Sequence, residues 1–385
     1  MRRAAGLLAC GLLLPACSGA LSVTGDGTWR SSAGQAMSDV HRTLVRDETC
    51  RQPLRLTVGG GALRLRLSNV LSPTPLALSA VTVGLRSSGP AVRPDSLRGV
   101  TVGGDASFVV PEGGAVTTDP VALTTAAGDD LLVSLAVDGE ARLSEHRFGA
   151  ATGWCTGPGT GDRTASAAGD GFGRGSRSGL VVDDVAVAAE AGGSGSVVAV
   201  GDSLTDDALL PADSHLRWTD VLAERLDGRP VVNAAIAGNC IVCEAGYGPP
   251  LVERFSRDAL SRSGIGIVVV LAGTNDLALR VPTPQLVDEL RQLVAAAQAE
   301  AVQVLLVTIP PAAQREPAQL AARHAVNDWI RDDSGADAVV DADRLLRDPA
   351  EPERLAPGYD YGDGLHLSVA GHRALAAAVA AALGE

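Results

Sequence analysis

The C-terminal half of this 385-residue chain contains a serine, a histidine and an aspartate of the kinds that catalyse acyl transfer. Ser203 lies in Gly-Asp-Ser-Leu, and Asp363 precedes His366 by three positions in Asp-Gly-Leu-His. A serine hydroxyl is a poor nucleophile unless a base takes its proton, and a carboxylate can hold that base in the required tautomer. These residues predict that Ser203 attacks a carbonyl carbon, with His366 as the base and Asp363 as its orienting partner.

Such a reaction also needs hydrogen-bond donors where negative charge develops on the carbonyl oxygen. Gly238 in Ala-Gly-Asn offers an unhindered backbone N–H, and Asn275 in Gly-Thr-Asn-Asp offers a side-chain amide. The N–H of Ser203 itself is a third candidate donor. Each segment taken alone also fits a turn or a helix cap. Their occurrence together favours one site with an oxyanion hole.

Short continuous apolar runs precede three of these segments and predict strands covered on both faces. Between the runs lie helical apolar stripes, one from Trp218 to Leu226 and another from Leu286 to Ala297. Strands that alternate with helices predict a parallel sheet with helices on both sides, and its site is expected at the carboxyl ends of the strands. The predicted strands are 197–200, 231–236, 265–271, 304–309 and 338–340.

The N-terminal half has a different pattern, in which apolar residues alternate with polar ones and turn residues recur. Several short strands without helical periodicity predict a β-sandwich. The Gly- and Ser-rich stretch 153–179 is assigned to loop. The strand-like runs are 54–58, 63–67, 80–83 and 131–137.

The start of the chain has the layout of a secretory signal: a basic beginning, an apolar run over residues 4–14 and small residues after it. The segment ending in Cys17 also resembles a bacterial lipobox, so a membrane tether through lipidated Cys17 and free secretion both remain open. We therefore expect a signal peptide at 1–20, a β-sandwich domain at 21–190, a linker at 191–196 and an α/β domain at 197–385.

Four of the six cysteines lie outside this leader, and disulfides persist in an oxidising compartment. We favour the pairs Cys50–Cys155 and Cys240–Cys243, because each then stays within one predicted domain. Unpaired buried thiols are the alternative. A zinc site at Cys240-x-x-Cys243 is disfavoured, because structural zinc sites usually need a second pair of ligands at matching spacing.

The charge balance excludes some classes of protein. Asp and Glu number 45 against 32 basic residues, which gives a net charge of −13 and argues against a nucleic-acid partner. The chain contains no lysine, so a lysine Schiff base and a Walker-type lysine are both excluded.

The four segments together resemble the SGNH, or GDSL-type, hydrolases, and they occur in the order typical of that family. The resemblance implies a flavodoxin-like three-layer fold, no metal or cofactor, and ester hydrolysis through an acyl-enzyme. It assigns the triad to Ser203, His366 and Asp363, and the oxyanion hole to Ser203, Gly238 and Asn275. The N-terminal half is similar to the β-sandwich that precedes this domain in secreted actinobacterial relatives, through residues 28–29, 65–69 and 119–121.

The chain departs from the family pattern directly after the nucleophile, where Asp206 and Asp207 replace a frequent glycine. We expect these two carboxylates to influence the charge preference for substrate. We expect a Cys240–Cys243 disulfide to stiffen the loop that carries Gly238. His146 and His372 have no matched partner in the sequence, and His372 is interpreted as a surface or packing residue.

The sequence therefore predicts a secreted or extracellular serine esterase, either free or anchored by lipid. Its expected substrates are short-chain acyl or acetyl esters of carbohydrates or lipids, either small molecules or polysaccharides. Two other interpretations remain open. One is a cell-surface glycan-binding protein with a vestigial hydrolase domain, and the other is an acyltransferase that uses the same acyl-enzyme.

Overall fold

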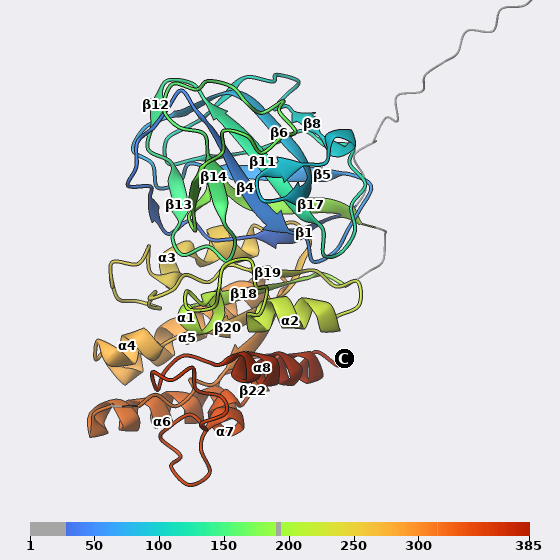
Figure 1. Cartoon of the computed structure of the whole chain (residues 1–385). Helices are drawn as coiled ribbons and strands as arrows, with labels where there is room; N and C mark the ends of the chain where they lie inside the picture. The colour runs from blue at the N-terminus through green and yellow to red at the C-terminus, as the bar shows by residue number, and fades with distance from the viewer. Residues whose placement is uncertain (1–27, 190–193, 314) are drawn as a thin grey trace, which may run out of the picture.

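The computed structural model describes residues 28–189, 194–313 and 315–385. Over these residues, a β-rich N-terminal part lies against an α/β part that contains the C-terminus (Figure 1). The predicted signal peptide and its Cys17 lie outside the described residues, as does the first half of the predicted linker, 191–193. Ser196, the last residue assigned to that linker, is already the first residue of a strand.

The N-terminal part consists mainly of two antiparallel sheets, which confirms the predicted β-sandwich. The first contains, in spatial order, β1 (Thr28–Gly34), β17 (Val182–Ala189), β5 (Leu63–Ser68) and β10 (Ala115–Thr117). The second contains β15 (Arg174–Ser176), β14 (Gly153–Cys155), β4 (Thr49–Arg55), β11 (Asp130–Val137), β6 (Leu76–Ser88) and β7 (Ala91–Val92). β6 also pairs with β8 (Arg98–Val100) and β9 (Phe108–Val110).

Short elements complete this part: the 3₁₀ turn η1 (Pro94–Ser96), β3 (Val45–Arg46) paired with β12 (Glu140–Ala141), and β13 (Ser144–His146) between β16 (Gly179–Leu180) and β2 (Asp39–Val40). Alternate residues of the longer strands point into one core, as in β5, where Leu63, Leu65 and Leu67 are fully buried. This period of two is the signal on which the sandwich prediction rested.

The assignment of residues 153–179 to loop is wrong in part, because β14 and β15 lie within this stretch. Both strands have three residues and lack an apolar alternation. Cys155 lies directly opposite Cys50 of β4 in the sheet register, and the two form the first favoured disulfide. Pairing with β4 and the disulfide hold this edge of the sheet, and neither leaves a hydrophobic pattern in the sequence.

The α/β part is built on a parallel sheet whose strands lie in the order β19, β18, β20, β21, β22. In chain order this is 2-1-3-4-5, the flavodoxin-like arrangement that the sequence resemblance implied. The strands are β18 (Ser196–Gly201), β19 (Val231–Asn233), β20 (Ile265–Leu271), β21 (Gln303–Val307) and β22 (Ala338–Val340).

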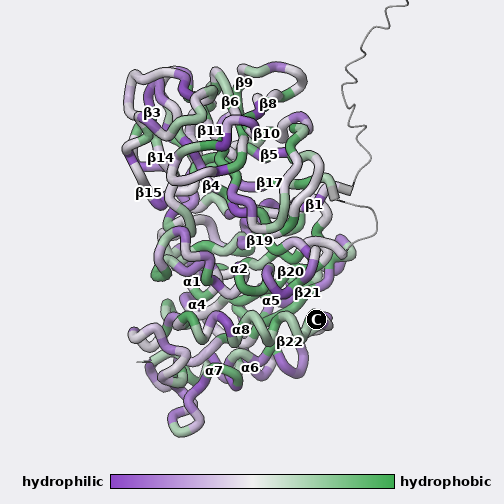
Figure 2. The backbone as a smooth tube through the Cα atoms, turned by 45° about the vertical axis from the view of Figure 1, so that its right-hand side comes forward, coloured by the Kyte–Doolittle hydropathy of each residue, from purple (hydrophilic) through white to green (hydrophobic). Residues whose placement is uncertain are grey.

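Successive residues of the central strands face opposite helical layers, so the sheet is apolar on both sides. Figure 2 shows hydrophobic residues, in green, along these strands. Val197 and Ala199 pack with α2 (Trp218–Arg225), α7 (Ala342–Leu346) and α8 (Val369–Ala382). Val198 and Val200 pack with α3 (Leu251–Phe255), α5 (Thr283–Ala299) and α6 (Pro317–Asp332). Short helices α1 (Ser203–Asp206) and α4 (Thr274–Ala278) follow β18 and β20, and the π-helix η2 (Ser256–Leu260) follows α3.

The two predicted amphipathic stripes are confirmed. Trp218 and Leu222 of α2 are buried. The apolar residues of the second stripe are buried in α5: Leu286, Leu290, Leu293, Val294 and Ala297. None of the helices in the described ranges is both long and apolar enough to cross a membrane.

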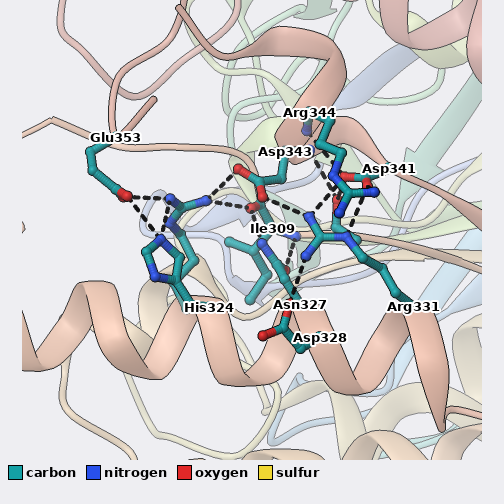
Figure 3. A network of polar contacts seen from close by, with 11 residues as sticks. Ile309, His324, Asn327, Asp328, Arg331, Asp341, Asp343, Arg344 and Glu353 are labelled. Carbon is teal, nitrogen blue, oxygen red and sulfur yellow. Dashed lines mark hydrogen bonds and ion pairs between the residues drawn. The ribbon is translucent and has the colours of Figure 1, made fainter. Parts of the chain in front are cut away.

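A polar network fixes the segment that follows β21 (Figure 3). The side chain of Asn327 accepts a hydrogen bond from the Ile309 N–H (2.8 Å) and donates one to the Ile309 carbonyl (2.9 Å). On the same helix, Arg331 donates to Asp341 (2.8 Å) and Asp343 (2.7 Å), which lie just after β22. These bonds tie α6 to the carboxyl ends of two strands.

The sandwich is joined to the α/β part by buried polar contacts, and β1 packs beside the edge strand β19. The guanidinium of Arg262 donates to the Asp184 carboxylate (2.9 Å) and to the backbone carbonyls of Asp183 (2.7 Å) and Gln35 (3.1 Å). Arg262 is buried, and a charge out of water needs such partners. The two parts therefore share a buried polar interface, in which Arg262 of the α/β part is hydrogen-bonded to residues of the sandwich.

Candidate active site

Ser203 lies at the carboxyl end of the second strand in the sheet order. β18 ends at Gly201, whose φ of 151° and close approach to the Leu271 carbonyl leave no room for a side chain. Asp202 then caps α1 by accepting the Leu204 N–H (3.0 Å). The serine is thus the first residue of a helix that begins immediately at the strand end.

The structure brings His366 and Asp363 to Ser203. The Nε2 atom of His366 lies 2.9 Å from the Ser203 hydroxyl oxygen, and its Nδ1 atom lies 2.6 Å from Asp363 Oδ2. Since an ionised carboxylate only accepts, Nδ1 carries the hydrogen and Nε2 is free to accept the serine proton. This is the tautomer that a serine nucleophile requires.

The loop before α8 holds this histidine. Asp363 Oδ1 accepts the N–H groups of Leu365 (3.0 Å) and His366 (2.9 Å), and Ser368 caps α8 by accepting the Gly371 N–H (3.2 Å). Burial acts to raise the pKa of Asp363, but the hydrogen bonds from His366 and the two amides outweigh it and lower that pKa. Asp363 is therefore held as a carboxylate.

Gly238 lies in a tight turn after β19. The Asn239 N–H donates to the Ile236 carbonyl (3.1 Å), and Gly238 has a φ of 79°, the left-handed conformation that favours glycine. A Cβ on Gly238 would lie 2.7 Å from the Tyr247 ring, so the ring covers this turn. Within the described part of the chain, the N–H groups of Gly238 and Ser203 have no hydrogen-bond acceptor, and both remain available to an oxyanion.

Asn275 lies on the first turn of α4, after β20, and its side-chain amide donates to the Asn239 carbonyl (2.8 Å). That bond places Asn275 next to the Gly238 turn and uses one of its two amide hydrogens. The second hydrogen can serve a substrate oxygen. The structure thus links Ser203, His366 and Asp363 by hydrogen bonds, and it links Asn275 to the turn that carries Gly238.

The segment after the Gly238 turn is fixed by Asp276 and by the second favoured disulfide, Cys240–Cys243. The Asp276 carboxylate accepts the N–H groups of Ile241 (2.8 Å) and Val242 (3.1 Å). Burial raises the pKa of Asp276, and these amides act against the rise. The disulfide loop therefore has a second, noncovalent anchor on the helix that carries Asn275.

The expectation that Asp206 and Asp207 influence substrate charge is wrong, because both are buried and bonded to histidines. Asp206 lies 3.1 Å from Nε2 of His146, and Asp207 lies 2.5 Å from Nε2 of His372. His372 is fully buried, which excludes a surface position, and Asp207 is the partner that the sequence did not reveal. No local pattern indicated either pair, because their members lie 60 and 165 positions apart.

Sequence reasoning also missed Arg254, a fully buried guanidinium beneath the site. It donates to the carbonyls of Gly201 (3.1 Å) and Ala234 (2.8 Å) and to the side chain of Asn239 (3.0 Å). One side chain therefore binds the ends of β18 and β19 together with the Gly238 turn. The spacing of four between Arg254 and Asp258, which are ion-paired, was the available signal.

Two clusters in the described ranges bring potential metal ligands together: Glu48 with Cys50 and Cys155, and Asp276 with Cys240 and Cys243. In both, the sulfur atoms are joined in disulfides and offer no thiolate. Neither cluster is therefore suited to a metal while its disulfide is intact.

Comparison with known families finds a match in the α/β part of the chain. Residues 199–374 match the model of the GDSL-like lipase/acylhydrolase family. This part of the chain belongs to that family. The GDSL-like domain includes all five candidate site residues. Because the domain belongs to a family of lipases and acylhydrolases, the protein is a carboxylic ester hydrolase. No curated protein matches the chain.

Solved structures similar to the GDSL-like domain include a GDSL-like lipase from Bacteroides thetaiotaomicron. It has 19% identity and a TM-score of 0.39, with 49% of this chain and 87% of that chain covered. Another is a variant of an acetyl xylan esterase from Geobacillus stearothermophilus, with 22% identity, a TM-score of 0.38, and 50% and 96% of the two chains covered.

Asp202 has an electrostatic property that sequence reasoning did not predict. Burial, reinforced by the nearby charge of Asp276, raises the pKa of Asp202 to about 7, against the bond from the Leu204 amide. Its Oδ2 atom is buried without a hydrogen-bond partner among the described residues. The folded protein therefore holds a proton on this acid at pH values where the unfolded chain, with an ordinary pKa of 3.8, has lost it.

Asp202→Asn is expected to change how stability depends on pH. The proton on Asp202 stabilises the folded state fully below the pKa that Asp202 has in the unfolded chain. This stabilisation is lost as pH rises toward 7, by about 1.4 kcal/mol per pH unit. Because asparagine mimics the neutral acid, the variant should lack this loss. In urea unfolding, the change in unfolding free energy between pH 5 and pH 7 should therefore differ from that of wild type by about 2 kcal/mol. Exposed Asp227→Asn serves as the control. Identical pH dependences for Asp202→Asn and wild type would contradict this account.

Proposed function

We propose that the GDSL-like domain is a serine esterase in which Ser203, His366 and Asp363 form the catalytic triad. The observation that carries this proposal is the hydrogen-bonded chain from Ser203 Oγ to His366 Nε2 (2.9 Å) and from His366 Nδ1 to Asp363 Oδ2 (2.6 Å). A vestigial domain has no need to maintain this arrangement, so the geometry favours an active enzyme over a glycan-binding protein.

In the acylation step, Ser203 Oγ attacks the ester carbonyl carbon while His366 Nε2 takes the hydroxyl proton. Asp363 stabilises the imidazolium that forms. The N–H groups of Ser203 and Gly238 and the free amide hydrogen of Asn275 bind the negative carbonyl oxygen. The tetrahedral intermediate then collapses: the carbon–oxygen bond to the alcohol breaks, and the alcohol leaves with the proton from His366.

In the deacylation step, His366 takes a proton from a water molecule that attacks the acyl-enzyme. The same donors stabilise the second oxyanion. Collapse breaks the bond between the acyl carbon and Ser203 Oγ, the serine regains its proton from His366, and the carboxylic acid departs. Replacement of water by another alcohol at this step would make the enzyme an acyltransferase.

We propose short-chain acyl or acetyl esters of carbohydrates or lipids as the substrates. Two exposed aromatic rings support this class: Tyr247, which covers the Gly238 turn and is 43% exposed, and Tyr361, which is 52% exposed and lies two residues before Asp363. Aromatic faces can contact the apolar face of a sugar or an acyl chain. Hydrolysis of p-nitrophenyl esters of increasing chain length, beside release of acetate from acetylated xylan, distinguishes these substrates.

We further propose that the enzyme acts outside the cytoplasm, either secreted or held by a lipid on Cys17. The two disulfides support this, because such bonds persist in oxidising compartments.

Ser203→Ala should abolish hydrolysis of p-nitrophenyl acetate while the protein remains folded, because no other described group supplies the nucleophile. Exposed Ser256→Ala, in the same domain, is the matched control and should retain wild-type turnover. Steady-state kinetics and far-UV circular dichroism check both variants. Unchanged turnover in folded Ser203→Ala would refute the triad.

Asn275→Ala should lower kcat about 100- to 1000-fold, as expected for loss of one oxyanion donor. The KM should change little, since this donor binds the transition state more strongly than the substrate. The midpoint of thermal unfolding shows whether loss of the hydrogen bond to the Asn239 carbonyl also destabilises the fold. A folded variant with kcat within about threefold of wild type would exclude Asn275 from the oxyanion hole.

A further inference from the structure

His146 belongs to the β-sandwich but is bonded to the GDSL-like domain. It is the last residue of β13 and is only 2% exposed. Its Nδ1 atom lies 2.8 Å from the Ala36 carbonyl oxygen, and its Nε2 atom lies 3.1 Å from Asp206 Oδ1. His146 of the sandwich therefore contacts the carboxylate of Asp206, which lies only three positions after the proposed nucleophile Ser203.

Both ring nitrogens of His146 face groups that accept hydrogen bonds. A carbonyl oxygen and a carboxylate can only accept, so each nitrogen carries a hydrogen and the ring is an imidazolium. Burial acts to lower the pKa of His146, but the charge and hydrogen bond of Asp206 and the Ala36 carbonyl outweigh it and raise that pKa. The contact is therefore a buried ion pair between the domains.

Asp206 extends this contact to the proposed oxyanion hole. Its Oδ2 atom accepts the Ala237 N–H (2.8 Å), and Ala237 directly precedes Gly238. The peptide between these two residues carries the Gly238 N–H that we propose as an oxyanion donor. In the Ile236–Asn239 turn this is the central peptide, and the positive φ of Gly238 fits a type II turn. Asp206 thus holds Ala237 in place, and the orientation of the Ala237–Gly238 peptide sets the direction of the Gly238 N–H.

A carboxylate this close to the oxyanion donors presents an electrostatic problem. Its negative charge in a buried site opposes the negative charge that develops on the substrate oxygen. Two other cations near Asp206 are already paired: the partly buried Arg217 with Asp220 (2.9 Å) and the buried Arg254 with Asp258 (3.3 Å). His146 is the cation bonded directly to Asp206.

We propose that His146 is a positioning residue for ester hydrolysis: its charge neutralises Asp206, which can then hold the Ala237–Gly238 turn without opposing the oxyanion. The β-sandwich thereby supplies a side chain on which the oxyanion hole of the GDSL-like domain depends. This inference rests on the function proposed above for Ser203 and Gly238.

The test compares His146→Gln with His146→Gln/Asp206→Asn in the full chain, using p-nitrophenyl acetate. His146→Gln leaves the buried carboxylate without its cation, so kcat should fall about 10- to 100-fold with KM changed less than about threefold. In the double variant, the amide oxygen that replaces the carboxylate still accepts the Ala237 N–H, but the pair is neutral. The double variant should recover about tenfold of the lost kcat.

Rescue separates this role from ordinary packing, because two damaging substitutions in one buried contact would otherwise reduce activity further. His41→Gln is the matched control: it removes another histidine–carboxylate pair of the sandwich, His41–Glu145 (2.6 Å), and should keep kcat close to that of wild type. Unchanged kcat in His146→Gln, or a double variant no more active than the single one, would overturn the proposal.

Asp206→Asn alone keeps the test decisive if His146→Gln does not fold. A neutral imidazole can accept a hydrogen bond from the introduced amide group, so both contacts of this side chain survive and the loss of kcat should stay below about tenfold. A loss above about a hundredfold would overturn charge neutralisation. Failure of the proposed function is a separate result, seen as wild-type protein without esterase activity or as Ser203→Ala with full activity.

Discussion

The site depends on one topological constraint: three parallel strands end side by side at the same edge of the sheet, with β18 between β19 and β20. The order reverses at β18, so the segments that follow the three strands meet there. Ser203 follows the central strand, Gly238 follows one neighbour and Asn275 follows the other. His366 is the exception, because it reaches Ser203 from the loop before the last helix.

That edge is held by polar groups that the reaction itself does not use. Arg254 binds two strand-end carbonyls and the side chain of Asn239, while Asp276 binds the disulfide loop. Each of these groups is buried, so each must have partners, and those partners are the backbone groups of the site. Oxyanion donors need this kind of fixed geometry, because they lower the barrier only if they do not have to move.

Most elements, and the segments that carry the candidate site residues, could be predicted from the sequence, because these depend on local patterns. Continuous apolar runs indicated the strands, and β20 begins and ends where its run does. Features that depend on contacts between segments far apart in the sequence were predicted poorly. The position of Asp206 close after Ser203 in the sequence suggests an influence on substrate charge. In the structure Asp206 is instead bonded to His146, which comes from the other domain and lies 60 positions away in the sequence. The strands β14 and β15 were missed because pairing and a disulfide, rather than alternation, define them.

The central claim is that Ser203 is the nucleophile of an acyl-enzyme. The most direct measurement is reaction of the wild-type protein with a fluorophosphonate, followed by intact mass spectrometry, peptide mapping and parallel esterase assays. We expect one adduct per chain, located on Ser203, that forms in step with the loss of ester hydrolysis. An adduct at another residue, or complete labelling of Ser203 with hydrolysis retained, would contradict the account.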